Sequence, residues 1–333
     1  MTDLSPQQLQ KLFETRIIPH LQDNRNTEPL DVEPGERPHF VSVGGQPGAG
    51  KGRVIEVSGR AHPGSVIVNG DDLRPFHPDY DQVMDADPLS MPEVTAQAAG
   101  TWVGMSNQWL RDNKISAVVE TTLRQPAVLL REFDAFKRAG YSTELRVVAV
   151  PPGVSRLGTV SRYIGQVQEF GAGRVVAAEG HDIPTAAVPD TVAALVASGL
   201  VDRVVVQDRD GRVFLDADVS ADGSELVAQA REVVDRAREV QAMAPEQAQG
   251  WFRAAGQAVE ALRDVPVDHD LLQVSARLTG DDAAAIAAHA WPRDQARQQS
   301  QVDELHQLHR NAATVAETRT ATRSAKAPVD DAE

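Results

Sequence analysis

The stretch Gly45-Gln46-Pro47-Gly48-Ala49-Gly50-Lys51-Gly52-Arg53 decides how the rest of the chain is interpreted. Its first seven residues match the phosphate-binding pattern G-x-x-x-x-G-K. Glycines let backbone N–H groups turn inward around phosphate oxygens, and the lysine reaches the β- and γ-phosphates. An apolar run, residues 40–43, precedes the motif, and the pattern from Val54 onward predicts a helix. The sequence therefore predicts a strand, a phosphate-binding loop and a helix, with all nine quoted residues around ATP.

One position in this loop departs from the pattern. The residue after the lysine is usually a serine or threonine whose hydroxyl contacts Mg²⁺. Here Gly52 is followed by Arg53, and neither side chain has a hydroxyl. Two interpretations stay open: either Mg²⁺ is held through water and by other carboxylates, or catalysis by this chain is impaired.

The flanking sequence alternates between strands and helices. Apolar runs predict strands at residues 40–43, 66–68, 115–119, 145–150 and 201–206, and helical spacing predicts helices at residues 95–110, 126–139, 156–170 and 189–198. Residues 213–216 can pair with the last of these strands through the turn Asp210-Gly211. This alternation predicts an α/β fold, in which a mainly parallel sheet carries helices on both faces.

The two ends of the chain differ from this middle part. Ser5 is expected to cap a helix, with Pro6 at its first position and Gln8 closing a capping box. From Ser224 onward the spacing predicts only helices, at residues 226–242, 245–262, 271–277, 281–290 and 295–314. We therefore expect an N-terminal helix and linker (1–38), a P-loop domain (39–222), a C-terminal helical extension (223–314) and a disordered tail (315–333).

Composition narrows the classes of function. The chain has 333 residues, of which 41% are apolar, so it can bury a sizeable core. It has no cysteine, which excludes disulfides, thiolate catalysis and cysteine-ligated metal centres. A formal net charge of −15 opposes nucleic-acid binding, for which basic patches supply most of the affinity. Residues 1–10 are polar, and no apolar run approaches the length of a membrane span. We expect a soluble, cytoplasmic protein without a nucleic-acid or membrane partner.

A second cluster of polar residues follows the predicted strand at residues 66–68. It reads Asn69-Gly70-Asp71-Asp72-Leu73-Arg74-Pro75-Phe76-His77-Pro78. A carboxylate just past a strand end lies at the carboxyl rim of a parallel sheet, where the phosphates also lie. Asp71 can accept a proton there from an attacking hydroxyl. The alternative is an aspartate that caps a helix, which suits Asp72 better.

Four motifs in this order resemble the zeta toxin family, which comprises bacterial kinases of toxin–antitoxin systems. They are the glycine loop, the segment around Asp71, the run Glu120-Thr121-Thr122-Leu123-Arg124, and the run Leu157-Gly158-Thr159-Val160-Ser161-Arg162-Tyr163 followed by Arg174 and His181-Asp182. The resemblance covers residues 38–210. The loop alone occurs in many families, whereas the ordered set is specific.

The resemblance implies a reaction and a set of site residues. Zeta toxins transfer the γ-phosphate of ATP to a sugar hydroxyl of UDP-N-acetylglucosamine, which blocks its use in cell-wall synthesis. Asp71 matches the general base, and Lys51, Arg162 and Arg174 match the phosphate-binding cations. Glu120, Thr122 and Arg124 match the contacts to the sugar nucleotide. ATP and Mg²⁺ are the implied cofactors, and an antitoxin chain is the implied protein partner.

The residues themselves add one expectation and leave two alternatives open. Residues 166–173 contain glycines and lie between Arg162 and Arg174, so we expect them to fold over the phosphates as a lid. The first alternative is a kinase of the same fold whose acceptor is another nucleotide sugar, a dinucleotide or an antibiotic, because pocket shape and not the loop selects the acceptor. The second is a catalytically impaired protein that binds nucleotide.

Overall fold

The computed structural model describes residues 3–25, 37–219 and 224–326. The chain forms two compact units. The first comprises Met1–Val150 with Asp182–Arg238, and the second comprises Pro151–His181 with Glu239–Glu333. The division of the chain into domains at residues 38, 222 and 314 stays a prediction.

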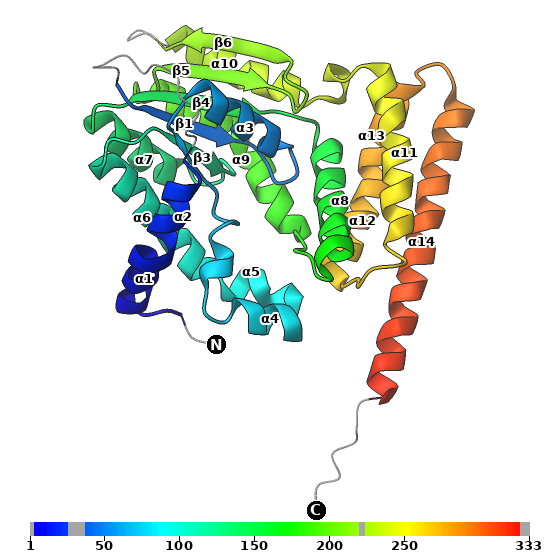
Figure 1. Cartoon of the computed structure of the whole chain (residues 1–333). Helices are drawn as coiled ribbons and strands as arrows, with labels where there is room; N and C mark the ends of the chain where they lie inside the picture. Colours follow the sequence, from blue (N-terminus) through cyan, green and yellow to red (C-terminus); the bar gives the residue numbers. More distant parts are fainter. Residues whose placement is uncertain (1–2, 26–36, 220–223, 327–333) are drawn as a thin grey trace, which may run out of the picture. The chain divides into compact units, whose positions relative to one another are not determined.

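The first unit is built on one six-stranded sheet in the order β2-β3-β1-β4-β5-β6 (Figure 1). Neighbouring strands are parallel except for β6, which runs antiparallel to β5. The predicted mainly parallel sheet is therefore confirmed. The strands are β1 (His39–Gly44), β2 (Val66–Val68), β3 (Ala117–Thr121), β4 (Ser142–Val148), β5 (Arg203–Gln207) and β6 (Val213–Asp218).

Both faces of this sheet are covered by helices. On one face of the sheet, alternate strand residues such as Phe40, Leu145 and Val204 form one apolar core with side chains of the helices that cover this face. Those helices are α6 (Ala96–Asp112), α7 (Pro126–Arg138), α9 (Ala178–Ala197) and α10 (Ser224–Ala237). The intervening residues Val41 and Val118 are also buried, and α3 (Lys51–Ala61) packs against β1, β2 and β3. Strands buried on both faces read as continuous apolar runs, which is why the sequence located them.

An N-terminal helical segment joins the same core. It consists of α1 (Pro6–Leu12), η1 (Phe13–Ile17) and α2 (Ile18–Asp23). The predicted capping box is confirmed, because the Ser5 hydroxyl accepts a hydrogen bond from the Gln8 amide and the Gln8 side chain accepts one from the Ser5 amide. Much of the expected linker at residues 22–38 lies outside the described residues. Between β2 and α6 lie the short elements η2 (Arg74–Phe76), α4 (Tyr80–Ala86), η3 (Pro88–Ser90) and α5 (Met91–Val94).

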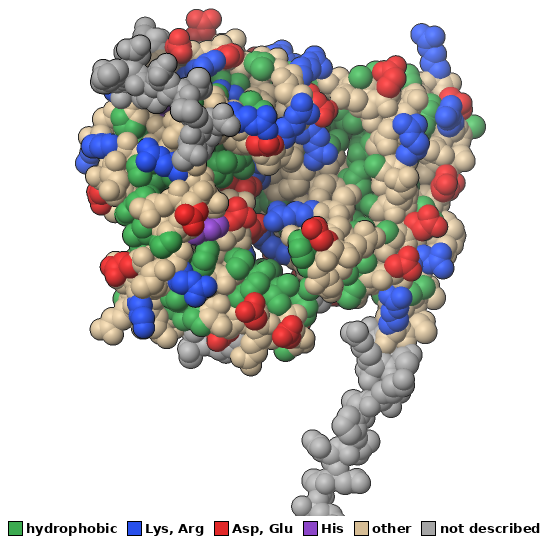
Figure 2. Space-filling view, in the orientation of Figure 1, with side chains coloured by type: hydrophobic (Ala, Val, Ile, Leu, Met, Phe, Trp, Pro, Cys, Tyr) green, Lys and Arg blue, Asp and Glu red, His purple; other side chains and the backbone are tan. Residues whose placement is uncertain are grey.

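The second unit is a bundle of helices. The helix α8 (Pro152–Phe170) packs against α11 (Pro245–Ala261) and α12 (His269–Arg277). Its other elements are η4 (Val240–Ala242), η5 (Leu278–Asp282), α13 (Ala283–Ala290) and α14 (Gln295–Lys326). Figure 2 shows acidic and basic side chains interspersed over these helices on the face drawn. The predicted C-terminal helical extension is confirmed as helical.

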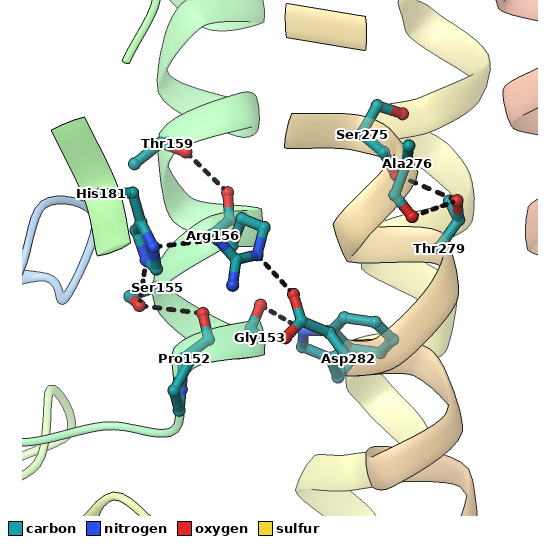
Figure 3. Close-up of polar contacts among 11 residues, drawn as sticks. Pro152, Gly153, Ser155, Arg156, Thr159, His181, Ser275, Ala276, Thr279 and Asp282 are labelled. Atoms are coloured by element: carbon teal, nitrogen blue, oxygen red, sulfur yellow. Dashed lines mark hydrogen bonds and ion pairs between the residues drawn. The ribbon is translucent and has the colours of Figure 1, made fainter. Parts of the chain in front are cut away.

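A buried polar chain holds the start of α8 in this bundle (Figure 3). Arg156 donates from Nε to Asp282 Oδ2 at 2.6 Å and from Nη1 to His181 Nδ1 at 3.0 Å. Arginine only donates, so Nδ1 is the acceptor and the proton of this neutral imidazole lies on Nε2. That proton points to the Ser155 hydroxyl 2.8 Å away, and the hydroxyl in turn donates to the Pro152 carbonyl. The chain thus joins α8, the start of α9 and η5 within one unit.

Several predicted element bounds are wrong. The helix predicted at residues 189–198 begins at Ala178 and contains Pro184 and Pro189, because burial of its apolar side chains outweighs the loss of two backbone donors. The helix predicted to end at residue 314 continues to Lys326, so the first part of the expected disordered tail is helical, and residues 327–333 lie outside the described part. No helix in the described residues is long and apolar enough to cross a membrane.

Candidate functional site

The glycine loop connects the last residue of β1, Gly44, to the first residue of α3, Lys51. Gly45, Gly48 and Gly50 have φ angles of 156°, 76° and 90°, which side-chain-bearing residues rarely adopt. A Cβ atom at Gly45 would lie 2.6 Å from the Val148 carbonyl oxygen. The spacing of these glycines is therefore required by the backbone, as the sequence predicted.

The start of α3 is suited to an anion. Gly50 is its N-cap and supplies no side-chain hydrogen bond to the first turn. The first N–H groups of a helix have no partner within the helix, and the helix dipole favours negative charge there. With Lys51 at the same point, these groups fit the phosphates of a nucleotide such as ATP.

Lys51 is buried at the loop, where it contacts backbone and a carboxylate. Its Nζ donates to the carbonyl oxygens of Gly45 at 3.0 Å and Gln46 at 3.2 Å. The same Nζ lies 3.3 Å from Glu120 Oε1. The strand register pairs Val43 with Glu120, which puts this carboxylate beside the loop. The sequence placed Glu120 just past its strand, whereas it lies within β3, because the strand extends to Thr121.

Asp71 lies in the turn after β2 and is held from two sides. Its amide donates to Asn69 Oδ1 at 3.0 Å, and its Oδ1 accepts from Arg74 Nε at 3.0 Å. Arg74 is in turn fixed by Nη1 contacts to the Pro92 carbonyl oxygen at 2.9 Å and to Thr95 Oγ1 at 2.6 Å. The orientation of the Asp71 carboxylate is therefore set by Arg74, for which the motifs predict no role. The spacing of three residues between Asp71 and Arg74 is the feature of the sequence that indicates this ion pair.

Thr122 and Arg124 are exposed and flank a buried, strained leucine. Leu123 has a φ of 54° and no exposed surface. Its amide donates to Thr121 Oγ1 at 3.2 Å, and its side chain fills the space that a Cβ at Gly44 would need. A left-handed conformation is rare for leucine and is found preferentially at functional loops. Leu123 thus anchors the segment that presents Thr122 and Arg124 to solvent.

Arg162 and Arg174 belong to the second unit. Arg162 is exposed on α8, and Arg174 is half-buried in the segment after α8, where its amide donates to Gln166 Oε1 at 2.9 Å. The predicted lid at residues 166–173 is not a single loop, because its first residues form the last turn of α8. Gly171 ends the helix with a φ of 78°, and Gly173 packs closely on the carbonyl oxygen of Tyr163.

Two further observations bear on chemistry at this rim. The described residues contain no group of three or more histidine, aspartate or glutamate side chains placed to hold a metal ion. No hydroxyl follows Lys51, so Asp71 and Glu120 are candidates to hold Mg²⁺ through water. Burial lowers the pKa of His77, although the neighbouring Asp79 opposes this, and the His77 Nδ1 accepts from the Asp79 amide. His77 is thus a turn residue in this structure.

The structure brings one set of predicted residues together and keeps another in a separate unit. The glycine loop, Lys51 and Glu120 meet where β1 and β3 end, and Asp71 follows the adjacent strand β2. Arg162 and Arg174 share the second unit. The roles of all these residues in binding and catalysis stay predictions.

Comparisons with known proteins agree with the family resemblance found in the sequence. A family model described as Zeta toxin matches residues 24–220. The Toxin PezT of Streptococcus pneumoniae serotype 4 (strain ATCC BAA-334 / TIGR4) is 27% identical over 184 residues, which cover 55% of this chain and 73% of that protein. The Toxin zeta of Enterococcus hirae is 26% identical over 205 residues, which cover 61% of this chain and 72% of that protein.

Solved structures share the fold. One from the PezAT chromosomal toxin–antitoxin system of the human pathogen Streptococcus pneumoniae has a TM-score of 0.56 and 22% identity, and the match covers 71% of this chain and 97% of that chain. A structure of the complex AvrRxo1-ORF1:-ORF2 has a TM-score of 0.50 and 16% identity, covering 87% of this chain and 94% of that chain. At these identities the likeness concerns the fold alone.

Proposed function

Because the chain belongs to the zeta toxin family, we propose that it is an ATP-dependent kinase whose acceptor is a sugar hydroxyl of UDP-N-acetylglucosamine. The observation that carries the proposal is the contact between Lys51 and Glu120, 3.3 Å apart, at the glycine loop. It joins the residue expected to hold the phosphates to one expected to hold the acceptor. Phosphorylation of this sugar nucleotide would withdraw it from cell-wall synthesis in the cytoplasm.

The residues present supply positioning and a base. The acceptor oxygen bonds to the γ-phosphorus while its proton passes to the Asp71 carboxylate. The bond between the γ-phosphorus and the β–γ bridging oxygen breaks, and ADP leaves. Lys51, with Arg162 and Arg174, would neutralise the charge on the moving phosphoryl group. Arg74 keeps the carboxylate of Asp71 in a fixed orientation.

Binding of the sugar nucleotide would involve Glu120, Thr122 and Arg124. Glu120 can accept hydrogen bonds from the sugar hydroxyls. The exposed Thr122 and Arg124 can contact the phosphates of the sugar nucleotide. Mg²⁺ bound with ATP would neutralise part of the charge on its phosphates. Position 52 supplies no hydroxyl for this ion. Another hydroxylated acceptor remains the alternative for the same machinery.

Gly52 is the specific observation in favour of a second function. A chain of this fold that lacks the hydroxyl ligand to Mg²⁺ would bind nucleotide without turning it over. The contacts around Lys51 and Asp71 favour the kinase, because a protein that only binds nucleotide has no use for an oriented base next to the acceptor site. An antitoxin chain is the protein partner we propose, by analogy with the toxin–antitoxin system of a structural relative.

The product identifies the function. The purified chain is incubated with ATP, Mg²⁺ and UDP-N-acetylglucosamine, and the nucleotides are analysed by mass spectrometry. We expect the sugar nucleotide to gain one phosphoryl group, and Lys51→Ala to abolish the gain. Consumption of ATP without this product would indicate another acceptor, and ATP binding without consumption would support the second function.

A further inference from the structure

An arginine outside all four motifs lies against the glycine loop. Arg209 belongs to the turn between β5 and β6, far along the chain from the loop. Its Nη2 donates to the Gly48 carbonyl oxygen at 2.6 Å, and its Nε lies 3.3 Å from the Ala49 carbonyl oxygen. A Cβ at Gly50 would lie 2.9 Å from the Arg209 Cβ, so the side chain also packs against the next residue of the loop.

The turn that carries Arg209 is rigidly built. Asp208 Oδ1 accepts hydrogen bonds from the amides of Asp210 and Arg212, both at 2.9 Å. The Asp208 amide donates to the Arg212 carbonyl oxygen at 3.0 Å. The end of β5 is tied to the end of β4, because the Ala149 amide donates to the Gln207 carbonyl oxygen at 2.8 Å. The contacts within the turn thus fix the direction of the Arg209 side chain independently of its contacts to the loop.

The two carbonyl contacts fix which way the loop amides face. In a trans peptide the N–H of the following residue points opposite to the carbonyl. Holding the carbonyls of Gly48 and Ala49 therefore directs the amides of Ala49 and Gly50 away from the guanidinium. The Ala49 amide donates to the Gln46 carbonyl oxygen at 3.2 Å and closes the loop. The Gly50 amide stands at the start of α3, where an anion would bind.

The charge of Arg209 is not neutralised by a direct partner. Among the described residues it forms no ion pair within 4 Å, and its hydrogen bonds go to neutral carbonyls. Burial lowers its pKa, an effect that the nearby charges of Asp210 and Asp208 oppose. A partly buried guanidinium with neutral partners is costly in the free protein, and a phosphate bound at the loop would compensate it.

We propose that Arg209 is a positioning residue of the nucleotide site: it holds the backbone at Gly48 and Ala49 in the phosphate-binding shape and adds a positive charge beside it. This inference deepens the proposed function and rests on it. Arg209 lies in the same unit as the loop, so its contacts to the loop are within one unit.

The test compares ligand binding in matched variants. Dissociation constants for ATP and for inorganic tripolyphosphate are measured by isothermal titration calorimetry, and thermal unfolding is followed without ligand. Arg209→Ala removes both contacts to the loop. Arg209→Lys keeps the charge but loses the two-pronged guanidinium. Arg212→Ala is the control, because Arg212 lies in the same turn and faces the Phe214 ring, 4.9 Å from its centroid.

We expect Arg209→Ala to weaken both ligands about ten-fold or more, the equivalent of one to two hydrogen bonds to a charged group. Arg209→Lys should fall between Arg209→Ala and wild type, and Arg212→Ala should bind like wild type. Binding by Arg209→Ala within two-fold of wild type would overturn the inference, even if its unfolding temperature fell. Full recovery by Arg209→Lys would show that charge alone acts and would overturn the positioning role. A wild-type chain that binds neither ligand would overturn the proposed function itself.

Discussion

Gly52 is the single residue that separates this loop from the usual phosphate-binding pattern. It lies in the first turn of α3, is exposed, and a Cβ added there would meet no atom within 4 Å. A serine therefore fits without rearrangement. Packing therefore does not prevent a hydroxyl-bearing side chain at position 52.

Restoring the hydroxyl tests whether Mg²⁺ is held less tightly in this chain. We expect Gly52→Ser to lower the Mg²⁺ concentration that gives half-maximal turnover, because the hydroxyl can contact the ion directly. The measurement is the rate of ATP consumption as a function of Mg²⁺.

Gly52→Ala is the matched control for this substitution. Both variants replace a glycine in a helix and should stabilise the fold by about 0.5 kcal/mol or more. An equal shift in Mg²⁺ dependence in both variants would assign the effect to the helix and contradict the role given to the hydroxyl.

The glycine loop could be predicted from the sequence residue by residue, because its conformation is local. Gly45, Gly48 and Gly50 are required by their own φ angles. Arg74 is indicated only by its spacing of three residues from Asp71, and Arg209 is not indicated by the sequence at all. Arg209 contacts the loop because the fold brings the turn between β5 and β6 next to it. A contact between residues so far apart in the chain produces no residue spacing that can be recognised in the sequence.

At the level of elements, α8 is held by a buried ion pair. The Arg156 and Asp282 side chains are 8% and 11% exposed, and their closest atoms are 2.6 Å apart. Burial raises the pKa of Asp282, and the Arg156 charge opposes this. Each charge thus offsets the burial of the other, and removing one of the two side chains should cost stability.

Removing one partner should destabilise the helical unit. We expect Asp282→Ala to lower the free energy of unfolding by about 3–5 kcal/mol, because Arg156 is left as a buried charge. Urea unfolding followed by circular dichroism measures the effect. The double variant Arg156→Met with Asp282→Leu should regain most of the loss, since no charge then remains to be paired. A double variant as unstable as Asp282→Ala would show that the ion pair is not the cause.

Element bounds were predictable where apolar spacing decides them. The strands at residues 40–43 and 66–68 and the helix starting at Pro126 lie where the sequence placed them. The helix α9 was missed in its first half, because Pro184 and Pro189 are local signals against a helix and tertiary packing overrides them. The assignment of Arg162 and Arg174 to another unit than the glycine loop was not visible in the sequence, because it depends on where α8 packs.

For the whole molecule, the pH dependence of stability should involve Asp202. Burial disfavours its charge, but the hydrogen bonds from Lys137 and from the Thr143 amide lower its pKa below the usual value of 3.8. An acid with a lowered pKa stabilises the fold above its unfolded pKa, and this stability is lost as pH falls through the folded pKa. Asp202 thereby links α7 to β4 and the start of β5.

We expect Asp202→Asn to lower the free energy of unfolding by about 1 kcal/mol at pH 7, a value reduced for the partial exposure of the carboxylate. The difference from wild type should shrink as the pH falls towards and below 4. Urea midpoints at several pH values measure it. Asp134→Asn is the control, because its partner Arg138 is exposed and the pair should contribute less. A difference that stays constant with pH would contradict the role of the charge.

In the proposed reaction Asp71 accepts the proton of the acceptor, while the glycine loop binds ATP independently of it. The most direct measurement compares Asp71→Asn with its neighbour Asp72→Asn, using the rate of phosphoryl transfer and the dissociation constant for ATP. We predict that Asp71→Asn transfers at least about 100-fold more slowly, with ATP binding within two-fold of wild type, while Asp72→Asn is active. Transfer by Asp71→Asn at the rate of wild type would show that Asp71 is not the base.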